Sequence, residues 1–258
     1  DGRYLAGIVA GMKLNEMIQK GEVTKDKCKI GYVGAFPYAE VISGFTSFYL
    51  GVKSVCDSAT MEVKYTNSWA SFDLEKECAE QLIADGCVLI SQHADTTGAP
   101  TACEAKKVPC VGYNIDMIPT APDAALTSAT INWGPYYTYA VQSVIEGTAI
   151  DTDWSKGVKD GADAITELND KTVAKGTKEK VEEAQKGIED GTIHVFDTSK
   201  FTVGGKTLEE LVESGDEDAT KLQSYIKDGY FHESDVAGGM TSAPAFTFII
   251  DGIDSITK

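Results

Sequence analysis

The sequence predicts an α/β fold built on a doubly wound parallel sheet. Short apolar runs rich in β-forming residues alternate with segments of helical periodicity between residues 28 and 133, as strands joined by crossover helices do. Aromatic and hydrogen-bonding residues follow each run. In a parallel sheet the carboxyl ends of all strands lie along one edge, where such folds bind ligands. We therefore expect these residues to converge on a binding crevice.

Five runs have the length and composition of buried strands. They are Lys29–Gly34, Met61–Thr66, Gly86–Gln92, Pro109–Asn114 and Ala125–Ile131. Between the first two, Tyr38–Val55 repeats apolar residues every three or four positions, which predicts an amphipathic helix. Asp73 and Thr97 are the expected N-caps of the next two helices, because their short polar side chains accept hydrogen bonds from free backbone N–H groups.

The flanking regions carry further expected elements. Residues 1–20 have an apolar helical face, and the glycines Gly7 and Gly11 permit close packing of this helix. After the fifth run we expect helices over 136–145, 178–188, 208–212 and 219–226, and strands over Gly161–Thr166, Thr192–Phe196 and Ala245–Ile250.

Composition narrows the range of partners. The chain has 40 acidic and 23 basic residues, for a net charge of −17, which argues against nucleic acid or an anionic membrane surface as a partner. No stretch approaches the ~18 consecutive apolar residues of a membrane-spanning helix.

The sequence predicts no catalytic residue, metal site or cofactor. The histidines His93, His194 and His232 are far apart and have no metal-ligand spacing. Ser91 is not part of the GxSxG turn of a nucleophile elbow. Neither GxGxxG nor the phosphate loop GxxxxGK[ST] occurs, so a nucleotide phosphate is not an expected ligand group.

Six cysteines lie between residues 28 and 110, none at CxxC spacing. Buried free thiols are one interpretation, and a disulfide formed in an oxidising compartment is the other. A helix that follows a parallel strand returns toward the start of that strand, so Cys103, late in its helix, would approach Cys87. We therefore consider Cys87–Cys103 as a possible disulfide, which requires Cα atoms within ~7 Å.

Several residues at the strand ends are candidates for ligand contact. Trp69 and Trp133 each follow a strand, where an indole ring can stack on a planar ligand or plug the edge of the domain. Asn114 and Asp116 suit ribose hydroxyls or a base edge, although Asx turns are a competing explanation. His93 suits a hydrogen bond to a ligand or to the protein itself.

Several segments together resemble a known family. They are Thr66–Cys87 (TNSWASFDLEKECAEQLIADGC), Ser91–Glu104 (SQHADTTGAPTACE), Val111–Met117 (VGYNIDM) and Thr127–Val141 (TSATINWGPYYTYAV), together with Arg3–Lys13 and Lys29–Val55. These segments are similar to the basic membrane protein family, the PnrA-like substrate-binding lipoproteins of bacterial ABC transporters. The resemblance covers nearly the whole chain.

The resemblance implies a periplasmic-binding-protein-like fold, in which two doubly wound lobes enclose the ligand. It implies a solute-binding protein of an ABC importer rather than an enzyme, with a purine nucleoside or related base as the ligand and a transporter permease as the partner. The ligand-binding residues carried over by motif are Phe36, Trp69, Gln92, His93, Asn114, Asp116 and Trp133.

The resemblance also implies a division of the chain. We expect residues 1–24 to be the remnant of a first lobe that is incomplete in this chain, and residues 25–131 to form the second lobe. Residues 132–192 would return to the first lobe, and residues 193–258 would cross the hinge and end as the tail of the second lobe. We expect the protein outside the cytoplasmic membrane, anchored by a lipid on an amino-terminal region that this chain lacks.

Two alternatives remain at this stage. One is an α/β enzyme of flavodoxin-like architecture. The other is the effector-binding core of a transcriptional regulator.

Overall fold

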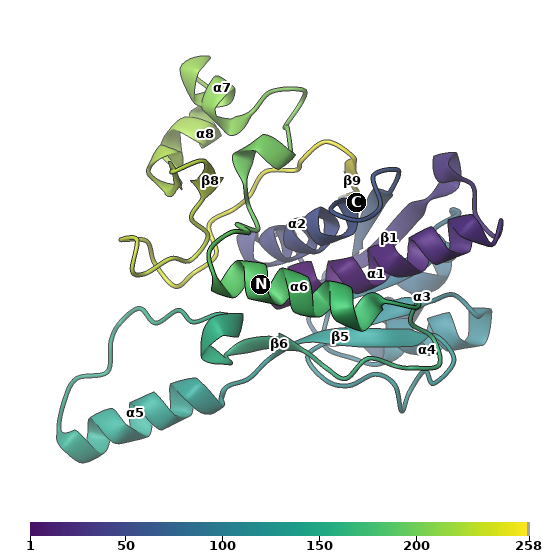
Figure 1. Cartoon of the computed structure of the whole chain (residues 1–258), viewed down its shortest axis with the longest axis horizontal. Coiled ribbons are helices and arrows are strands. Elements are labelled where there is room, and N and C mark those ends of the chain that lie inside the picture. Colours follow the sequence, from purple (N-terminus) through teal and green to yellow (C-terminus); the bar gives the residue numbers. More distant parts are fainter. Residues whose placement is uncertain (257–258) are drawn as a thin grey trace.

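The computed structural model describes residues 1–256, which build a seven-stranded sheet covered by helices (Figure 1). The strand order is β6-β5-β4-β3-β1-β2-β9, and only β6 runs antiparallel to its neighbour. The strands are β1 (Lys29–Gly34), β2 (Thr60–Tyr65), β3 (Leu89–His93), β4 (Cys110–Tyr113), β5 (Ala125–Ile131), β6 (Asp163–Ile165) and β9 (Ile253–Ile256). The predicted α/β class with a doubly wound parallel sheet is confirmed.

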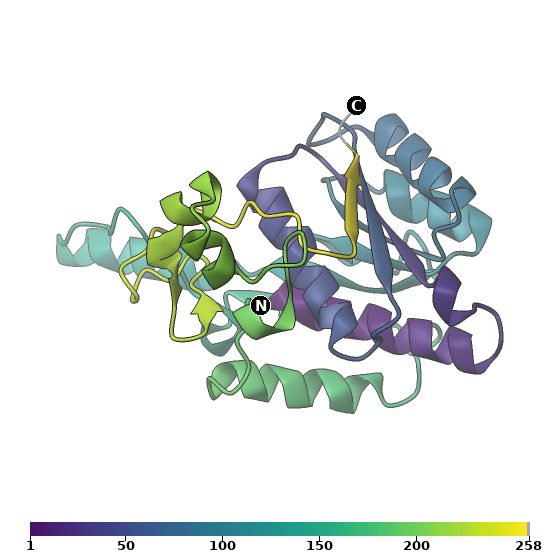
Figure 2. The ribbon, with the colours of Figure 1, turned by 90° about the horizontal axis from the view of Figure 1, so that it is seen from above.

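Helices cover both faces of the sheet. On one face lie α1 (Gly2–Gln19) and α2 (Ala39–Lys53), and on the other lie α3 (Phe72–Ala84) and α4 (Gly98–Lys106). Figure 2 shows α3 and α4 on one side of the strands and α1 on the other. Because strand side chains alternate between the two faces, β1 sends Tyr32 into the larger core under α1 and α2 and Val33 into the smaller core under α3 and α4.

Close contact between α1 and α2 depends on glycine. A Cβ added at Gly7 would lie 2.0 Å from the carbonyl oxygen of Phe48, and one added at Gly51 would lie 2.0 Å from that of Tyr4. The two backbones are therefore in contact, as the close packing expected at Gly7 requires. We expected residues 1–24 to belong to a first lobe; in the structure α1 packs on α2, β5 and α6. The division of the whole chain into lobes stays a prediction.

The chain after β5 is less enclosed. Helix α5 (Gly134–Glu146) extends away from the sheet (Figure 1). The chain then returns through β6, which pairs with β5, and through α6 (Thr177–Glu189), which packs on α1.

The last part of the described chain forms a small aromatic cluster before it rejoins the sheet. It contains α7 (Leu208–Glu213), α8 (Glu217–Lys221) and the hairpin of β7 (Ile226–Lys227) with β8 (Tyr230–Phe231). Its core consists of Phe196, Phe201, Phe231, Phe246 and Phe248, all buried.

Two strands expected in this region are not formed. Residues 245–250 bury alternate side chains in the aromatic cluster, and the Glu233 carboxylate accepts hydrogen bonds from the backbone N–H groups of Ala245 (3.0 Å) and Phe246 (2.9 Å). These N–H groups are thus satisfied without a neighbouring strand. The strand that joins the sheet is β9, a few residues later. Residues 192–196 form a bend, an irregular stretch and a turn instead of a strand.

The possible disulfide between Cys87 and Cys103 is not formed in this structure. Both side chains are buried free thiols in the core under α3 and α4. The Cys103 thiol lies against Cys110, and its hydrogen bond to Cys110 together with burial raises the pKa of Cys103. The topology brings Cys103 back to a strand, where its neighbour is Cys110 of β4.

Candidate functional site

Aromatic side chains from four neighbouring strand ends form a continuous belt, which we call the ring belt: Phe36, Trp69, His93 and Tyr113. Phe36 follows β1 and lies 5.5 Å from the Trp69 ring, which follows β2, measured between ring centroids. The Trp69 ring lies 6.4 Å from His93 at the end of β3, and His93 lies 4.8 Å from Tyr113 at the end of β4. Tyr38 extends the belt by stacking on Phe36 at 5.0 Å. The parallel sheet thus gathers rings that are distant in the sequence.

Arg3, at the start of α1, contacts both the ring belt and the strands of the sheet. Its guanidinium carbon lies 4.1 Å from the centre of the Tyr113 ring, a distance at which the cation is attracted to the ring face. Its Nη1 donates hydrogen bonds to the Tyr32 hydroxyl (2.7 Å) and to the carbonyl oxygen of Gln92 (3.3 Å). One cation therefore connects the ends of β1, β3 and β4.

His93 is a buried and neutral member of the belt. Only 2% of it is exposed, and burial together with the nearby Arg3 charge lowers its pKa to about 3. Glu40 lies 3.9 Å from its Nε2 and offsets only part of that effect. Gly44 of α2 leaves room for the side chains of His93 and Arg3, since a Cβ at this position would lie 2.6 Å from His93 Nδ1 and 2.9 Å from Arg3 Nε.

Gln92 supports the site from inside the fold. Its side chain is buried, and its Nε2 donates hydrogen bonds to the carbonyl oxygens of Ala94 (2.7 Å) and Thr96 (3.0 Å). These bonds shape the loop that follows β3. In this conformation the Gln92 amide positions the loop, and its role in ligand binding stays a prediction.

Asn114 and Asp116 are exposed at the edge beyond β4. Asn114 has a positive φ of 72°, a conformation that asparagine tolerates better than most residues, and its Nδ2 donates a hydrogen bond to Asp95 at 3.2 Å. Asp116 accepts a hydrogen bond from the N–H of Ile118 at 2.9 Å, which is the Asx bonding expected of a turn. The carboxylates of Asp95 and Asp116 both retain oxygen lone pairs that can accept a hydrogen bond from a ligand hydroxyl.

Trp133 lines a pocket together with His93 and Tyr113 of the ring belt. It is 55% exposed, and its ring neighbour is Tyr137 at 6.2 Å. The pocket has a volume of about 440 Å³, within the range of small-molecule sites. Its lining includes Arg3, Glu40, His93, Tyr113, Trp133 and Glu233. Phe36 and Trp69 are outside this lining and reach it through His93. We call this the edge pocket.

Charge in the edge pocket is mixed. Arg3 and Lys156 contribute positive groups, and Glu40, Asp163 and Glu233 contribute carboxyl groups. Burial raises the pKa of Glu233 to about 7, against the opposing effect of its backbone hydrogen bonds. Within residues 1–256 no cluster of three or more His, Cys, Asp or Glu side chains could hold a metal ion. The arrangement suits a planar ligand with polar edges.

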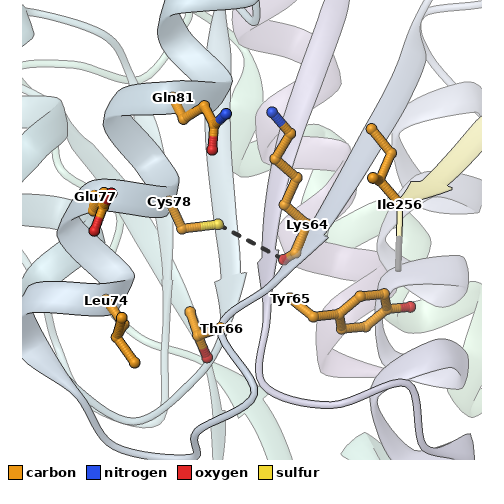
Figure 3. A pocket seen from close by; sticks show the side chains of 8 residues that line it. All are labelled: Lys64, Tyr65, Thr66, Leu74, Glu77, Cys78, Gln81 and Ile256. Atoms are coloured by element: carbon orange, nitrogen blue, oxygen red, sulfur yellow. Dashed lines mark hydrogen bonds between the residues drawn. The ribbon is translucent and has the colours of Figure 1, made fainter. Parts of the chain in front are cut away.

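A smaller pocket lies between β2, β9 and α3, on another part of the sheet (Figure 3). Its volume is about 200 Å³, and its lining contains none of the seven residues expected to bind ligand. Cys78 Sγ donates a hydrogen bond to the carbonyl oxygen of Lys64 at 3.8 Å, and Lys64 Nζ pairs with Glu62 and Asp85. We assign no ligand to this pocket, because it is small and shares no lining residue with the edge pocket.

Sequence reasoning missed Arg3 and Tyr113. Arg3 precedes the first predicted strand by many residues, so the rule that strand ends converge does not find it. It is, however, the only arginine in the sequence, and arginine suits stacking on aromatic rings better than lysine does. Tyr113 lies inside the predicted run Pro109–Asn114, so it was not among the residues after the strand that were considered for ligand contact.

Comparisons with known proteins place the chain in a family. The family model described as "ABC transporter substrate-binding protein PnrA-like" matches residues 1–197. A purine-binding protein of Brucella abortus is 32% identical over 196 residues, which are 76% of this chain and 52% of that protein. A putative ABC transporter glucose-binding protein of Haloferax volcanii is 31% identical over 200 residues, or 77% of this chain and 48% of that protein. The chain thus spans about half the length of these curated relatives.

Solved structures share the fold at low sequence identity. An ABC transporter solute-binding protein of Aeropyrum pernix has a TM-score of 0.64 and 18% identity, with 84% of this chain and 69% of that chain covered. A transcriptional activator of the comK gene of Bacillus halodurans has a TM-score of 0.60 and 20% identity, with 75% and 64% covered. The match over three quarters of the sequence is decisive: this chain belongs to the family of PnrA-like substrate-binding proteins of ABC transporters.

Proposed function

We propose that this protein is the solute-binding component of an ABC importer and that its edge pocket and ring belt bind a purine nucleoside or a related base. The ring belt is the observation that carries this proposal. Three of the seven residues expected to bind ligand, Phe36, Trp69 and His93, lie in it. Stacking of a base on an aromatic ring contributes about 1–3 kcal/mol, and a purine presents two planar faces for such contacts.

Polar groups at the edge suit the rest of a nucleoside. Asp95, Asn114 and Asp116 lie beyond β3 and β4, where their carboxylate and amide groups can bind ribose hydroxyls. Trp133, at the start of α5, also lines the pocket. We propose that the ligand lies between Trp133 and these polar groups, with its base against an aromatic face and its sugar toward the polar loops.

A purine is preferred to a sugar because of the ring belt, since the named relatives point to different ligands. The Brucella abortus relative is named a purine-binding protein, whereas the Haloferax volcanii relative is named a putative glucose-binding protein. Their identities to this chain are nearly equal, so the relatives alone do not choose between the two ligands. The extent of the ring belt favours the base.

The remaining parts of the proposal follow from the family. The protein delivers its ligand to a permease on the outer side of the cytoplasmic membrane and performs no chemistry on it. A lipid anchor would hold it there. No helix within residues 1–256 is long and apolar enough to span a membrane.

Isothermal titration calorimetry against a panel tests the ligand class. The panel contains adenosine, guanosine, inosine, their free bases, ribose and glucose. We expect a purine to bind and neither sugar to bind. Binding of glucose without any purine would refute the purine assignment and favour the function for which the Haloferax volcanii relative is named.

Two tryptophan variants place the ligand. Trp133→Ala should weaken purine binding by about 1–3 kcal/mol, the range for loss of a base–aromatic stack. Trp154→Ala is the matched control, because Trp154 packs on Tyr136 and Tyr139 and is outside the edge pocket. Equal affinity of wild type and Trp133→Ala would remove Trp133 from the site.

A further inference from the structure

Two buried thiols meet at the amino-terminal edge of the sheet, opposite the ring belt. Cys28 directly precedes β1, and Cys56 follows the end of α2. Their Sγ atoms lie 3.9 Å apart, and each residue is only 2% exposed. Helix α2 follows β1 and returns toward the start of that strand, which brings Cys56 close to Cys28. The same rule suggested the pair Cys87 and Cys103 from the sequence.

Backbone hydrogen bonds hold both cysteines in place. The carbonyl oxygen of Cys28 accepts a hydrogen bond from the N–H of Thr60 at 3.0 Å. The N–H of Cys56 donates to the carbonyl oxygen of Val52 at 2.8 Å, and its own carbonyl oxygen accepts from Ala59 at 3.2 Å. A disulfide needs an S–S distance of about 2.0 Å. Rotation about χ1 moves each sulfur without moving the backbone.

We propose that Cys28 and Cys56 form a disulfide that fastens the end of α2 to the start of β1. The bond would enclose residues 28–56, which contain the first strand and the first crossover helix of the sheet. It would stabilise the protein by restricting the unfolded chain. The pair lies away from the edge pocket, so the proposal does not depend on which ligand the protein binds.

The reaction requires a disulfide donor, for which oxidised glutathione is the probe. The Cys56 thiolate attacks one sulfur of the donor, which forms a mixed disulfide and releases one glutathione thiolate. The Cys28 thiolate then attacks the Cys56 sulfur, which forms the Cys28–Cys56 bond and releases the second glutathione thiolate. The two protein thiols lose two protons and two electrons, and the donor is reduced to two thiols.

The local chemistry supports this order of attack. The hydrogen bond from Cys28, together with hydrogen bonds around Ser58, lowers the pKa of Cys56 to about 6, and the same pairing with Cys56 raises the pKa of Cys28. The thiolate is the attacking form in thiol–disulfide exchange. Cys87 differs, because burial raises its pKa to about 12.

Refolding in a glutathione redox buffer tests the proposal on the full 258-residue chain. The reduced, unfolded protein is refolded with oxidised and reduced glutathione, remaining thiols are alkylated, and a non-reduced digest is mapped by mass spectrometry. We expect a linked peptide that contains Cys28 and Cys56. The oxidised protein should melt roughly 5 °C or more above the reduced protein.

Two variants make the assignment specific. Cys28→Ser should abolish both the linked peptide and the difference in melting temperature. Cys87→Ser, also at a buried cysteine, should retain both. The wild-type peptide map decides the question even if Cys28→Ser fails to fold. Linkage of Cys87 to Cys103, linkage of Cys103 to Cys110, or full alkylation of Cys28 and Cys56 after refolding would overturn the proposal.

Discussion

Helices α2 and α5 both follow a strand end, yet their surroundings differ. In α2, twelve of fifteen residues are buried, because α1 covers one side of the helix and the sheet covers the other. In α5 only Ser143 is buried among thirteen residues. Tyr137, Val141, Val144 and Ile145 lie on one face of α5 and are 58–73% exposed.

The two helices show how much an apolar helical pattern predicts. An apolar stripe predicts that a helix has a face to bury, but it does not identify the covering surface. For α2 that surface is in the same chain. The α5 stripe is a contiguous apolar surface of the kind that another body commonly covers. Both regions contribute to the lining of the edge pocket, α2 through Gly44 and the start of α5 through Trp133.

The largest expected difference between the two helices is in core stability. Phe45→Ala in α2 should lower the free energy of unfolding by about 3–5 kcal/mol, because Phe45 is fully buried in the larger core. Ile145→Ala in α5, at 73% exposure, should change it by less than about 0.5 kcal/mol. Urea unfolding of this chain measures both. A loss of several kcal/mol for Ile145→Ala would mean that the α5 stripe is covered in solution.

The second prediction concerns the effect of acid on the free energy of unfolding through His93. His93, which packs against Gly44 of α2, has a pKa lowered to about 3, while an unfolded histidine titrates near ~6.5. Below pH 6.5 the unfolded chain binds a proton that the folded chain does not. The stability of wild type should therefore fall as the pH drops from 6.5 toward 3, by up to roughly 4 kcal/mol.

His93→Gln serves as the comparison, measured by urea unfolding at several pH values. Glu233 has a pKa raised to about 7 and therefore opposes this trend, since its contribution to stability is lost as the pH rises through 7. Because Glu233 is present in both proteins, its effect cancels in the difference. A difference between wild type and variant that stays constant from pH 7 to pH 4 would show that His93 titrates normally.

The third prediction compares glycines at the two helices. Gly7→Ala should cost about 1–3 kcal/mol, because its Cβ would force apart the backbones of α1 and α2. Gly134→Ala, at the start of α5, should be nearly neutral, because the nearest atom to its Cβ is a side-chain oxygen of Asn132 at 3.1 Å. Thermal unfolding of both variants checks this. Equal melting temperatures would indicate that α1 and α2 separate easily.

Much of the sheet was predictable because its strands are apolar and bounded by turn residues. The run Ala125–Ile131 matches β5 at both ends. β9 was missed for a physical reason. Its sequence, IDSI, is short and half polar, whereas the preceding residues 245–250 (AFTFII) are almost entirely apolar. Those apolar side chains pack in the aromatic cluster, so an apolar run was present without a strand.

The residues of the site that follow strand ends were predictable, because the carboxyl ends of parallel strands converge at one edge of the sheet. Phe36, Trp69 and His93 were brought together for this reason. Gln92 also lies at a strand end, but its side chain bonds inward to the loop after β3, which no spacing indicates. Arg3 reaches the site from the start of a helix. The ligand-binding roles of all these residues stay predictions.

Hydrogen–deuterium exchange with and without a saturating purine nucleoside tests the central claim most directly. Our account predicts that α2 amides exchange slowly in both states and that α5 amides exchange quickly without ligand. On addition of the purine, peptides covering 93–97 and 131–137 should gain protection, and glucose should cause no change. Protection confined to residues 64–81 around the smaller pocket, or no protection with any purine, would contradict the assignment of the ligand to the edge pocket.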